Sequence, residues 1–170
     1  MKYVLLVAAF VLAGTTSFAQ GDKSKRPSPP AEAKASIGGT DSVKIIYSQP
    51  SLKGREIGKD VEPFEGKVWR AGANEATIFE VSRAVKINGM ELPAGKYALF
   101  MIAGAREWTI IFNKTWNQWG AFSYKQEDDA LRISVKVRQN AVSQDKLTYN
   151  INGDVVTLLW GTYTVSFSVN

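Results

Sequence analysis

Residues 131–138 read Leu-Arg-Ile-Ser-Val-Lys-Val-Arg, and this strict alternation of apolar and polar side chains decides the fold class. Successive side chains of an extended strand point to opposite faces, so the apolar residues share one face and the polar residues the other. The pattern is typical of an antiparallel strand with one face on a core and one in solvent. No convincing helical period occurs elsewhere in the chain, which indicates β structure throughout.

The sequence after this strand keeps the same two-residue period. Residues 147–151 alternate in the same way, and Asn152-Gly153 is a strong hairpin-turn signal. An apolar run follows at 155–160, and we interpret Gly161-Thr162 as a turn into another alternating segment at 163–169. These segments predict a three-strand meander in the C-terminal third of the chain.

The middle of the chain carries similar signals. Residues 43–47 alternate, Asn88-Gly89 marks a hairpin, and 97–103 is apolar on both faces, as in a central strand. We count about eight to ten short strands, with turn signals about every eight to twelve residues. The sequence therefore predicts an all-β fold, an antiparallel β-sandwich of jelly-roll-like or Greek-key type. The long irregular segments 50–66 and 113–129 are expected to cross between its sheets.

The N-terminus has the three parts of a secretory signal peptide. Lys2 supplies a positive charge, residues 4–13 are apolar, and Ser17-Phe18-Ala19 places small residues where a signal peptidase reads them. The apolar stretch is shorter than the about twenty residues that span a bilayer; a retained membrane anchor is the alternative interpretation. We expect residues 1–19 to be removed and the protein to be periplasmic or extracellular, with no membrane span in the remaining chain.

The remaining chain is expected to form one domain. Residues 20–35 are polar and contain Pro27, Pro29 and Pro30, so we interpret them as a flexible linker. Residues 36–170 then form a single β-sandwich domain, which is long enough to bury a core without the help of disulfides.

Composition removes several kinds of chemistry. The chain has no cysteine and no histidine, so thiolate catalysis, serine–histidine triads and histidine-based zinc sites are impossible within it. The formal net charge of +5 comes from scattered basic residues, unlike the concentrated charge of a nucleic-acid-binding surface. We expect no nucleic-acid partner, no metal and no cofactor. The acidic run 127–129 is interpreted as a solvated turn, with a calcium site as the alternative.

The stretch 66–77 looks most like a functional site. It reads Gly-Lys-Val-Trp-Arg-Ala-Gly-Ala-Asn-Glu-Ala-Thr and brings Trp69, Arg70, Asn74 and Glu75 within a few positions of each other. If a strand begins at Glu75, its side chain shares a face with the apolar residues that follow and lies at the rim of the core. A carboxylate there needs a partner, and we expect Arg70 to be that partner. The pair could line a ligand site, or it could only fix the loop.

A second cluster of aromatic residues lies in the connection 113–124. Trp116, Trp119, Phe122 and Tyr124 alternate there with amide and hydroxyl side chains. Aromatic faces stack on sugar rings and cations, so this segment is compatible with glycan binding. The alternative is that the aromatic side chains close the open end of the sandwich. We expect Trp116 to be exposed and Trp119 to be a core plug.

Several motifs together resemble a known family. They are Tyr47–Pro50, Lys67–Thr77, Leu92–Tyr97, Trp108–Lys114 and Trp119–Phe122, in this order. The chain is similar over about residues 33–169 to the secreted bacterial family catalogued as domain of unknown function 2911. The resemblance implies a single envelope or secreted domain and supplies no activity, substrate or catalytic residue.

Three functional hypotheses follow. The first is a non-catalytic binding domain that grips a glycan or another polar small ligand with Trp69, Arg70, Asn74, Glu75 and Trp116. The second is a structural or assembly component of the cell envelope without a small-molecule ligand. The third is a histidine-free hydrolase that depends on Glu75. The sequence does not determine the oligomeric state.

Overall fold

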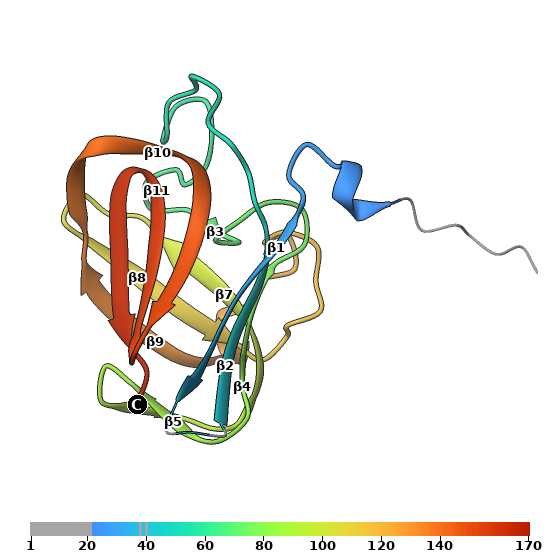
Figure 1. Ribbon diagram of the computed structural model, residues 1–170, viewed down its shortest axis with the longest axis vertical. Coiled ribbons are helices and arrows are strands. Elements are labelled where there is room, and N and C mark those ends of the chain that lie inside the picture. Colours follow the sequence, from blue (N-terminus) through green and yellow to red (C-terminus); the bar gives the residue numbers. More distant parts are fainter. Residues whose placement is uncertain (1–21, 38, 40) are drawn as a thin grey trace, which may run out of the picture.

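The computed structural model describes residues 22–37, 39 and 41–170, and the fold consists mainly of antiparallel strands (Figure 1). The signal peptide expected at 1–19 lies outside the described residues. The main sheet has seven strands, in the spatial order β1 (Pro30–Ile37), β2 (Asp41–Ser48), β4 (Thr77–Val81), β7 (Gly95–Ile102), β8 (Glu107–Asn113) and β9 (Asp129–Lys136), with β3 (Val68–Trp69) also paired to β7.

Two further antiparallel pairs complete the fold. The long hairpin of β10 (Arg138–Asn152) and β11 (Val155–Ser168) curves over one face of the main sheet (Figure 1). The short hairpin of β5 (Val85–Ile87) and β6 (Met90–Leu92) lies near the C-terminus, where Ile87 bridges to Val169. Short 3-10 helices occur at Lys23–Lys25 and Gln126–Asp128.

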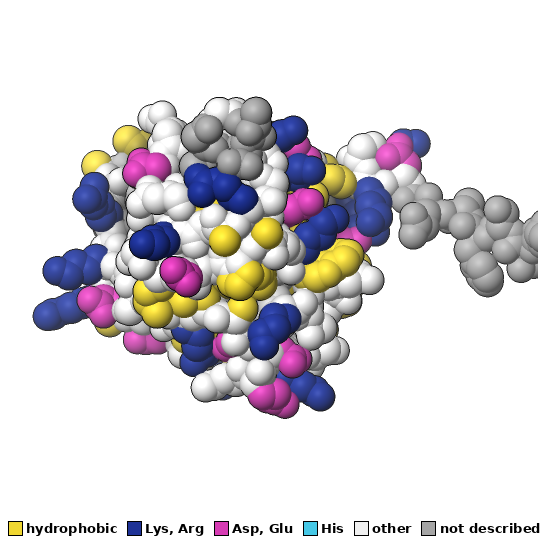
Figure 2. All heavy atoms as spheres, turned by 90° about the horizontal axis from the view of Figure 1, so that it is seen from below, with side chains coloured by type: hydrophobic (Ala, Val, Ile, Leu, Met, Phe, Trp, Pro, Cys, Tyr) yellow, Lys and Arg dark blue, Asp and Glu magenta, His cyan; other side chains and the backbone are white. Residues whose placement is uncertain are grey.

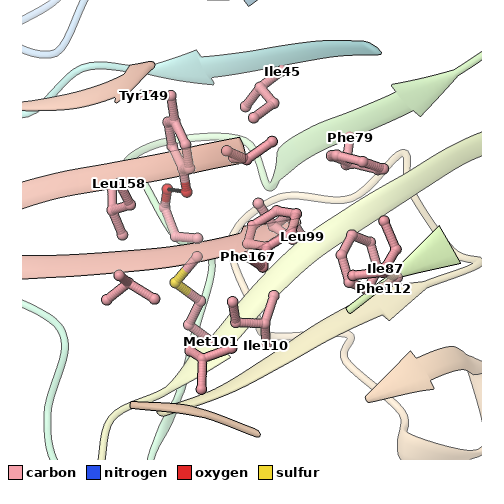
Figure 3. Close-up of a cluster of buried hydrophobic side chains, with 14 of the residues drawn as sticks. Ile45, Phe79, Ile87, Leu99, Met101, Ile110, Phe112, Tyr149, Leu158 and Phe167 are labelled. Atoms are coloured by element: carbon pink, nitrogen blue, oxygen red, sulfur yellow. Dashed lines mark hydrogen bonds between the residues drawn. The ribbon is translucent and has the colours of Figure 1, made fainter. Parts of the chain in front are cut away.

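The hydrophobic core lies between the main sheet and the long hairpin. Figure 3 shows Ile45, Phe79 and Leu99 of the main sheet meeting Tyr149 and Phe167 of the hairpin. Aromatic rings pack edge to face across this interface, as favoured by their quadrupoles. The predicted all-β antiparallel sandwich is therefore confirmed, and β7 is the central strand expected from its apolar sequence.

Details of the topology differ from the prediction. The main sheet is a meander of successive strands, without the returning strand that defines a Greek key or jelly roll. The long connections 50–66 and 113–129 do not switch sheets, because each begins and ends at strands of the main sheet. The described residues contain eleven strands, slightly more than expected.

The turn predicted at Gly161-Thr162 is wrong, because β11 runs through both residues. Gly161 has a φ of +58° and pairs with Gln144 beside a register shift. A glycine in this conformation accommodates a bulge within one long strand. The three-strand meander is also wrong, because the segments 155–160 and 163–169 are one strand, β11, which forms a two-strand hairpin with β10.

The linker predicted at 20–35 is wrong for its second half, because β1 begins at Pro30 and pairs with β2 along its full length. Ala31 and Ala33 pack against the core, while Glu32 and Lys34 face solvent. Alanine is small, so this alternation is weak in the sequence. The proline is tolerated because it is the first residue of an edge strand, where its missing N–H costs no ladder bond.

The side of the molecule seen in Figure 2 carries charges of both signs. Lys and Arg side chains are spread over the side of the molecule seen in Figure 2, with acidic side chains and small hydrophobic patches between them. Within the described residues, no helix has the length and apolarity needed to cross a membrane.

Candidate functional site

The polar stretch 70–76 forms a loop that leaves the main sheet and returns to it. On one side of β7, Trp69 of β3 pairs with Met101, and Thr77 of β4 pairs with Leu99. Seven residues, 70–76, thus connect two ladder positions that are separated on β7 by a single residue, Phe100. We call residues 70–76 the polar bend.

The polar bend is held in place by buried hydrogen bonds. The carbonyl oxygen of Ala71 accepts from the hydroxyl of Thr77 at 3.0 Å and from the hydroxyl of Tyr149 at 2.8 Å. Burial raises the pKa of Tyr149, so its hydroxyl stays protonated and can donate. Ala71 and Asn74 both have positive φ, which turns the chain twice within the bend.

Close packing leaves no room for a side chain at Gly72. A Cβ there would lie 2.7 Å from the hydroxyl oxygen of Thr77 and 3.2 Å from the carbonyl oxygen of Ser48. The carbonyl oxygen of Gly72 accepts a hydrogen bond from the indole N–H of Trp69 at 3.1 Å. Trp69 is itself a core residue, 1% exposed and packed edge-on against Trp108. The bend is therefore a rigid structure anchored to the core.

A cavity of about 320 Å³ opens beside the polar bend. Its lining includes Arg70 and Asn74 from the bend and the indoles of Trp69 and Trp160. The long connection after β2 supplies the remaining charged groups, which are Arg55, Asp60 and Glu62. We call this space the Arg70 cavity.

Arg70 pairs with Glu62, and the Arg70–Glu75 pair predicted from the sequence is wrong. Arg70 Nη2 lies 3.0 Å from Glu62 Oε2, and Nη1 donates to the carbonyl oxygen of Asn74 at 3.2 Å. Among the described residues, the buried Nε of Arg70 has no hydrogen-bond partner. Gly120 has a φ of +63°, and a Cβ there would lie 3.1 Å from Arg70 Nη1, so a side chain at this position would be strained and would crowd the guanidinium.

Glu75 lies on the other side of the bend, with different partners. Its two carboxylate oxygens each lie 3.0 Å from Nη1 of Arg26, and Oε1 lies 3.1 Å from Nζ of Lys23. Partial burial alone would raise the pKa of Glu75, but hydrogen bonds from its own backbone N–H and from Arg26 and Lys23 outweigh burial and lower it. The strand begins only at Thr77, so strand alternation does not govern the direction of Glu75.

Trp116 lies with Glu75 rather than with Arg70. Both line a second cavity of about 200 Å³, together with Lys23 and Gln118. The structure therefore divides the five predicted site residues into two groups. Trp69, Arg70 and Asn74 line the Arg70 cavity, and Glu75 and Trp116 line the second one.

The aromatic connection lies on the outer face of the main sheet, opposite the long hairpin. Trp119 is 54% exposed and Phe122 is 83% exposed, so the prediction that Trp119 is a core plug is wrong. Trp116 is exposed, as predicted. Cations lie over these rings: Lys96 Nζ is 5.4 Å from the Trp116 ring, and the guanidinium carbons of Arg26 and Arg70 are 6.0 Å from Trp119 and Phe122.

A buried polar network fastens this connection to the sheet. Asn113 is fully buried and donates to the carbonyl oxygen of Lys125 at 2.9 Å and to Asp129 Oδ1 at 2.8 Å. Tyr124 donates to Asp129 Oδ2 at 2.7 Å and packs edge-on against Phe100. Burial and the Asp129 carboxylate raise the pKa of Tyr124 to about 12. Asp129 is thus engaged in the network and is not part of a solvated turn.

The remaining site residues carry weaker signals in the sequence. Glu62 and Arg55 lie in an irregular connection with no period to place them, and Trp160 sits in an apolar run that indicates only burial. Lys23 and Arg26 fall in a proline-containing segment that is typical of a linker. Only long-range pairing places these residues at the bend, and single-sequence periodicity does not report it.

The fold and site define a small antiparallel β-sandwich with a rigid polar bend and a charged cavity beside it. The chain belongs to the family described as protein of unknown function, DUF2911, whose model matches residues 28–169. A search of curated proteins and a search of solved structures each found no match.

Proposed function

We propose that this protein is a non-catalytic binding domain for a polar small ligand, such as a glycan unit, and that the ligand binds in the Arg70 cavity. The observation that carries the proposal is the lining of this cavity, where Arg70 and Asn74 of a bend held by buried hydrogen bonds lie beside two tryptophans around an open space of about 320 Å³. A few fixed polar groups among aromatic side chains are typical of sites that bind small ligands.

The charges around the cavity favour a neutral hydroxylated ligand over an anion. Two arginines, Arg55 and Arg70, are balanced by two carboxylates, Asp60 and Glu62. Hydroxyl groups both donate and accept hydrogen bonds, so they can use donors and acceptors from the same wall. The volume of about 320 Å³ lies at the lower end of the about 300–1,000 Å³ of small-ligand sites.

The environment of Glu75 argues against the alternative of a carboxylate-dependent hydrolase. A general acid needs a raised pKa, whereas the pKa of Glu75 is lowered by its hydrogen bonds to Arg26 and Lys23. The second alternative, a structural component of the cell envelope, differs from the binding proposal in one respect, because it requires no ligand in the Arg70 cavity. We further propose that the protein acts outside the cytoplasm, on the basis of its N-terminal signal peptide.

A glycan array followed by thermal unfolding tests the binding role. Hits from the array should raise the melting temperature of the wild-type protein and of Arg106→Gln, a control whose arginine is exposed and does not line the cavity. The variant Arg70→Gln should fold but show no ligand-dependent shift. A screen of glycans and polar metabolites without any hit, or equal shifts in Arg70→Gln, would favour the structural alternative.

A further inference from the structure

The segment just before β1 is docked onto the polar bend by one arginine. We call residues 22–28 the N-terminal arm. Arg26 of the arm places Nη1 3.0 Å from each oxygen of the Glu75 carboxylate, and its guanidinium carbon lies 6.0 Å from the centre of the Trp119 ring. Its side chain is only 30% exposed, although the arm belongs to the surface. A carboxylate and an indole thus hold one guanidinium together.

The other contacts of the arm are few and also polar. Lys23 Nζ lies 3.1 Å from Glu75 Oε1, and the side-chain amide of Asn74 donates to the carbonyl oxygen of Ser28 at 3.1 Å. Within the described residues, the remaining backbone hydrogen bonds of the arm are internal, from Lys25 to Asp22 and from Arg26 to Lys23. The arm is therefore held in the manner of a bound peptide, by its side chains and one carbonyl, and not as a strand of the sheet.

Hydrogen bonds that do not involve the arm hold Glu75 and Trp119 next to each other. The backbone of Glu75 bridges to that of Trp119, and the N–H of Ala76 donates to the carbonyl oxygen of Gln118 at 3.0 Å. These bonds fix the carboxylate and the indole relative to each other. Glu75 is 37% exposed and Trp119 is 54% exposed, so a group from solution can reach both once Arg26 leaves.

We propose that Glu75 and Trp119 form a recognition site for a guanidinium group, occupied in the free protein by Arg26 of the arm. A basic peptide segment that carries an arginine competes with the arm for this site. Ser28 of the arm also lines the Arg70 cavity, but Glu75 and Trp119 do not. A test that measures arginine binding at Glu75 therefore has an outcome separate from that of the proposed glycan binding. Exposed ion pairs are individually weak, which permits the arm to be displaced.

The arm sequence itself, supplied as a separate molecule, is the probe. A fluorescently labelled peptide of residues 22–30 (Asp-Lys-Ser-Lys-Arg-Pro-Ser-Pro-Pro) is titrated with the full chain by fluorescence anisotropy. The variant Lys23→Gln/Arg26→Gln is the host protein for this titration, because its own arm has no cation to place on Glu75. The control Lys25→Gln/Lys34→Gln removes the same charge but keeps Arg26 on Glu75.

We expect the peptide to bind Lys23→Gln/Arg26→Gln at least about tenfold more tightly than it binds the wild-type protein or the control. Adding Glu75→Gln to that host should remove the gain, and so should glutamine in place of the peptide's arginine. Far-UV circular dichroism checks that each variant is folded. Equal affinity for all hosts, affinity unaffected by Glu75→Gln, or no binding to any host would overturn the proposal.

Discussion

At the scale of single residues, the two carboxylates at the polar bend, Glu62 and Glu75, have different surroundings. The Arg70–Glu62 pair lines a cavity, and the side chain of Arg70 is only 18% exposed. Glu75 is directed outward, because Asn74 has a φ of +58° and turns the chain before the strand begins. One left-handed residue thus separates Arg70 from Glu75, which are close in the sequence, and each of them pairs with a residue outside the bend.

The exposure of Glu75 predicts a small effect on stability. Glu75→Gln should change the free energy of unfolding by less than about 1 kcal/mol, because a partly exposed ion pair contributes little. The folded-state pKa of Glu75 lies below its ordinary value of 4.5, so its contribution is present above that pH and is lost as pH falls through the folded-state pKa. Urea unfolding at pH 6 and in the acid range should show a smaller acid loss for Glu75→Gln than for wild type.

A loss well above 2 kcal/mol for Glu75→Gln would indicate that the carboxylate is buried in solution, and it would contradict the exposed pair.

The raised pKa of Tyr124 predicts that the stability of the protein falls at alkaline pH. Its pKa is about 12 in the folded protein and 10.0 ordinarily. The stability that comes from this difference is fully present below pH 10 and is lost as pH rises through about 12. Tyr124→Phe should therefore lose less stability than the wild type when urea unfolding at pH 9 is compared with pH 11. Identical pH dependence in the two proteins would show that the hydroxyl is not held by Asp129.

At the scale of elements, periodicity succeeded where side chains are large. The central strand β7 is apolar on both faces and is recognised from its sequence, and the alternation at 131–137 correctly predicts β9. The same method missed β1, whose core-facing residues are alanines, and it divided β11 at Gly161. A glycine in a strand signals either a turn or a bulge, and only the register with the partner strand distinguishes them.

The candidate site was likewise predicted only in part, because its pairing depends on contacts between distant segments. The polar bend was found because its unusual residues are adjacent in the sequence. Its pairing was not, since Arg26, Glu62 and Trp119 reach the bend through contacts between distant segments. Local spacing therefore locates such a site but does not determine which charge meets which.

The aromatic connection supplies a prediction at this scale. Asn113→Ala should destabilise the protein by about 1–3 kcal/mol, because it removes the buried donor to the carbonyl oxygen of Lys125 and to Oδ1 of Asp129. The matched control Asn117→Ala, in an exposed position of the same connection, should change stability by less than about 0.5 kcal/mol. Chemical denaturation measures both, and equal effects would show that Asn113 does not anchor the connection.

At the scale of the whole molecule, the core and the composition bear on where the protein can fold. Side chains of the main sheet and of the long hairpin form one continuous core, and the chain has no cysteine. A domain of this length buries enough apolar surface to be stable without covalent cross-links. Folding should therefore proceed equally in a reducing and in an oxidising compartment.

Export can then be tested without a confounding effect on folding. We expect the full-length chain, expressed in a Gram-negative host, to accumulate outside the cytoplasm with Gln20 as its first residue. This expectation rests on the positive charge at Lys2, the apolar stretch and Ala19, which match the pattern of a cleavable signal. Cell fractionation and intact mass measure this. Ala19→Tyr should leave the signal attached, because the peptidase accepts only a small residue there. A cytoplasmic product that retains residues 1–19 would contradict export. A good soluble yield of the chain expressed without residues 1–19 would then show that the failure of export was not caused by a failure to fold.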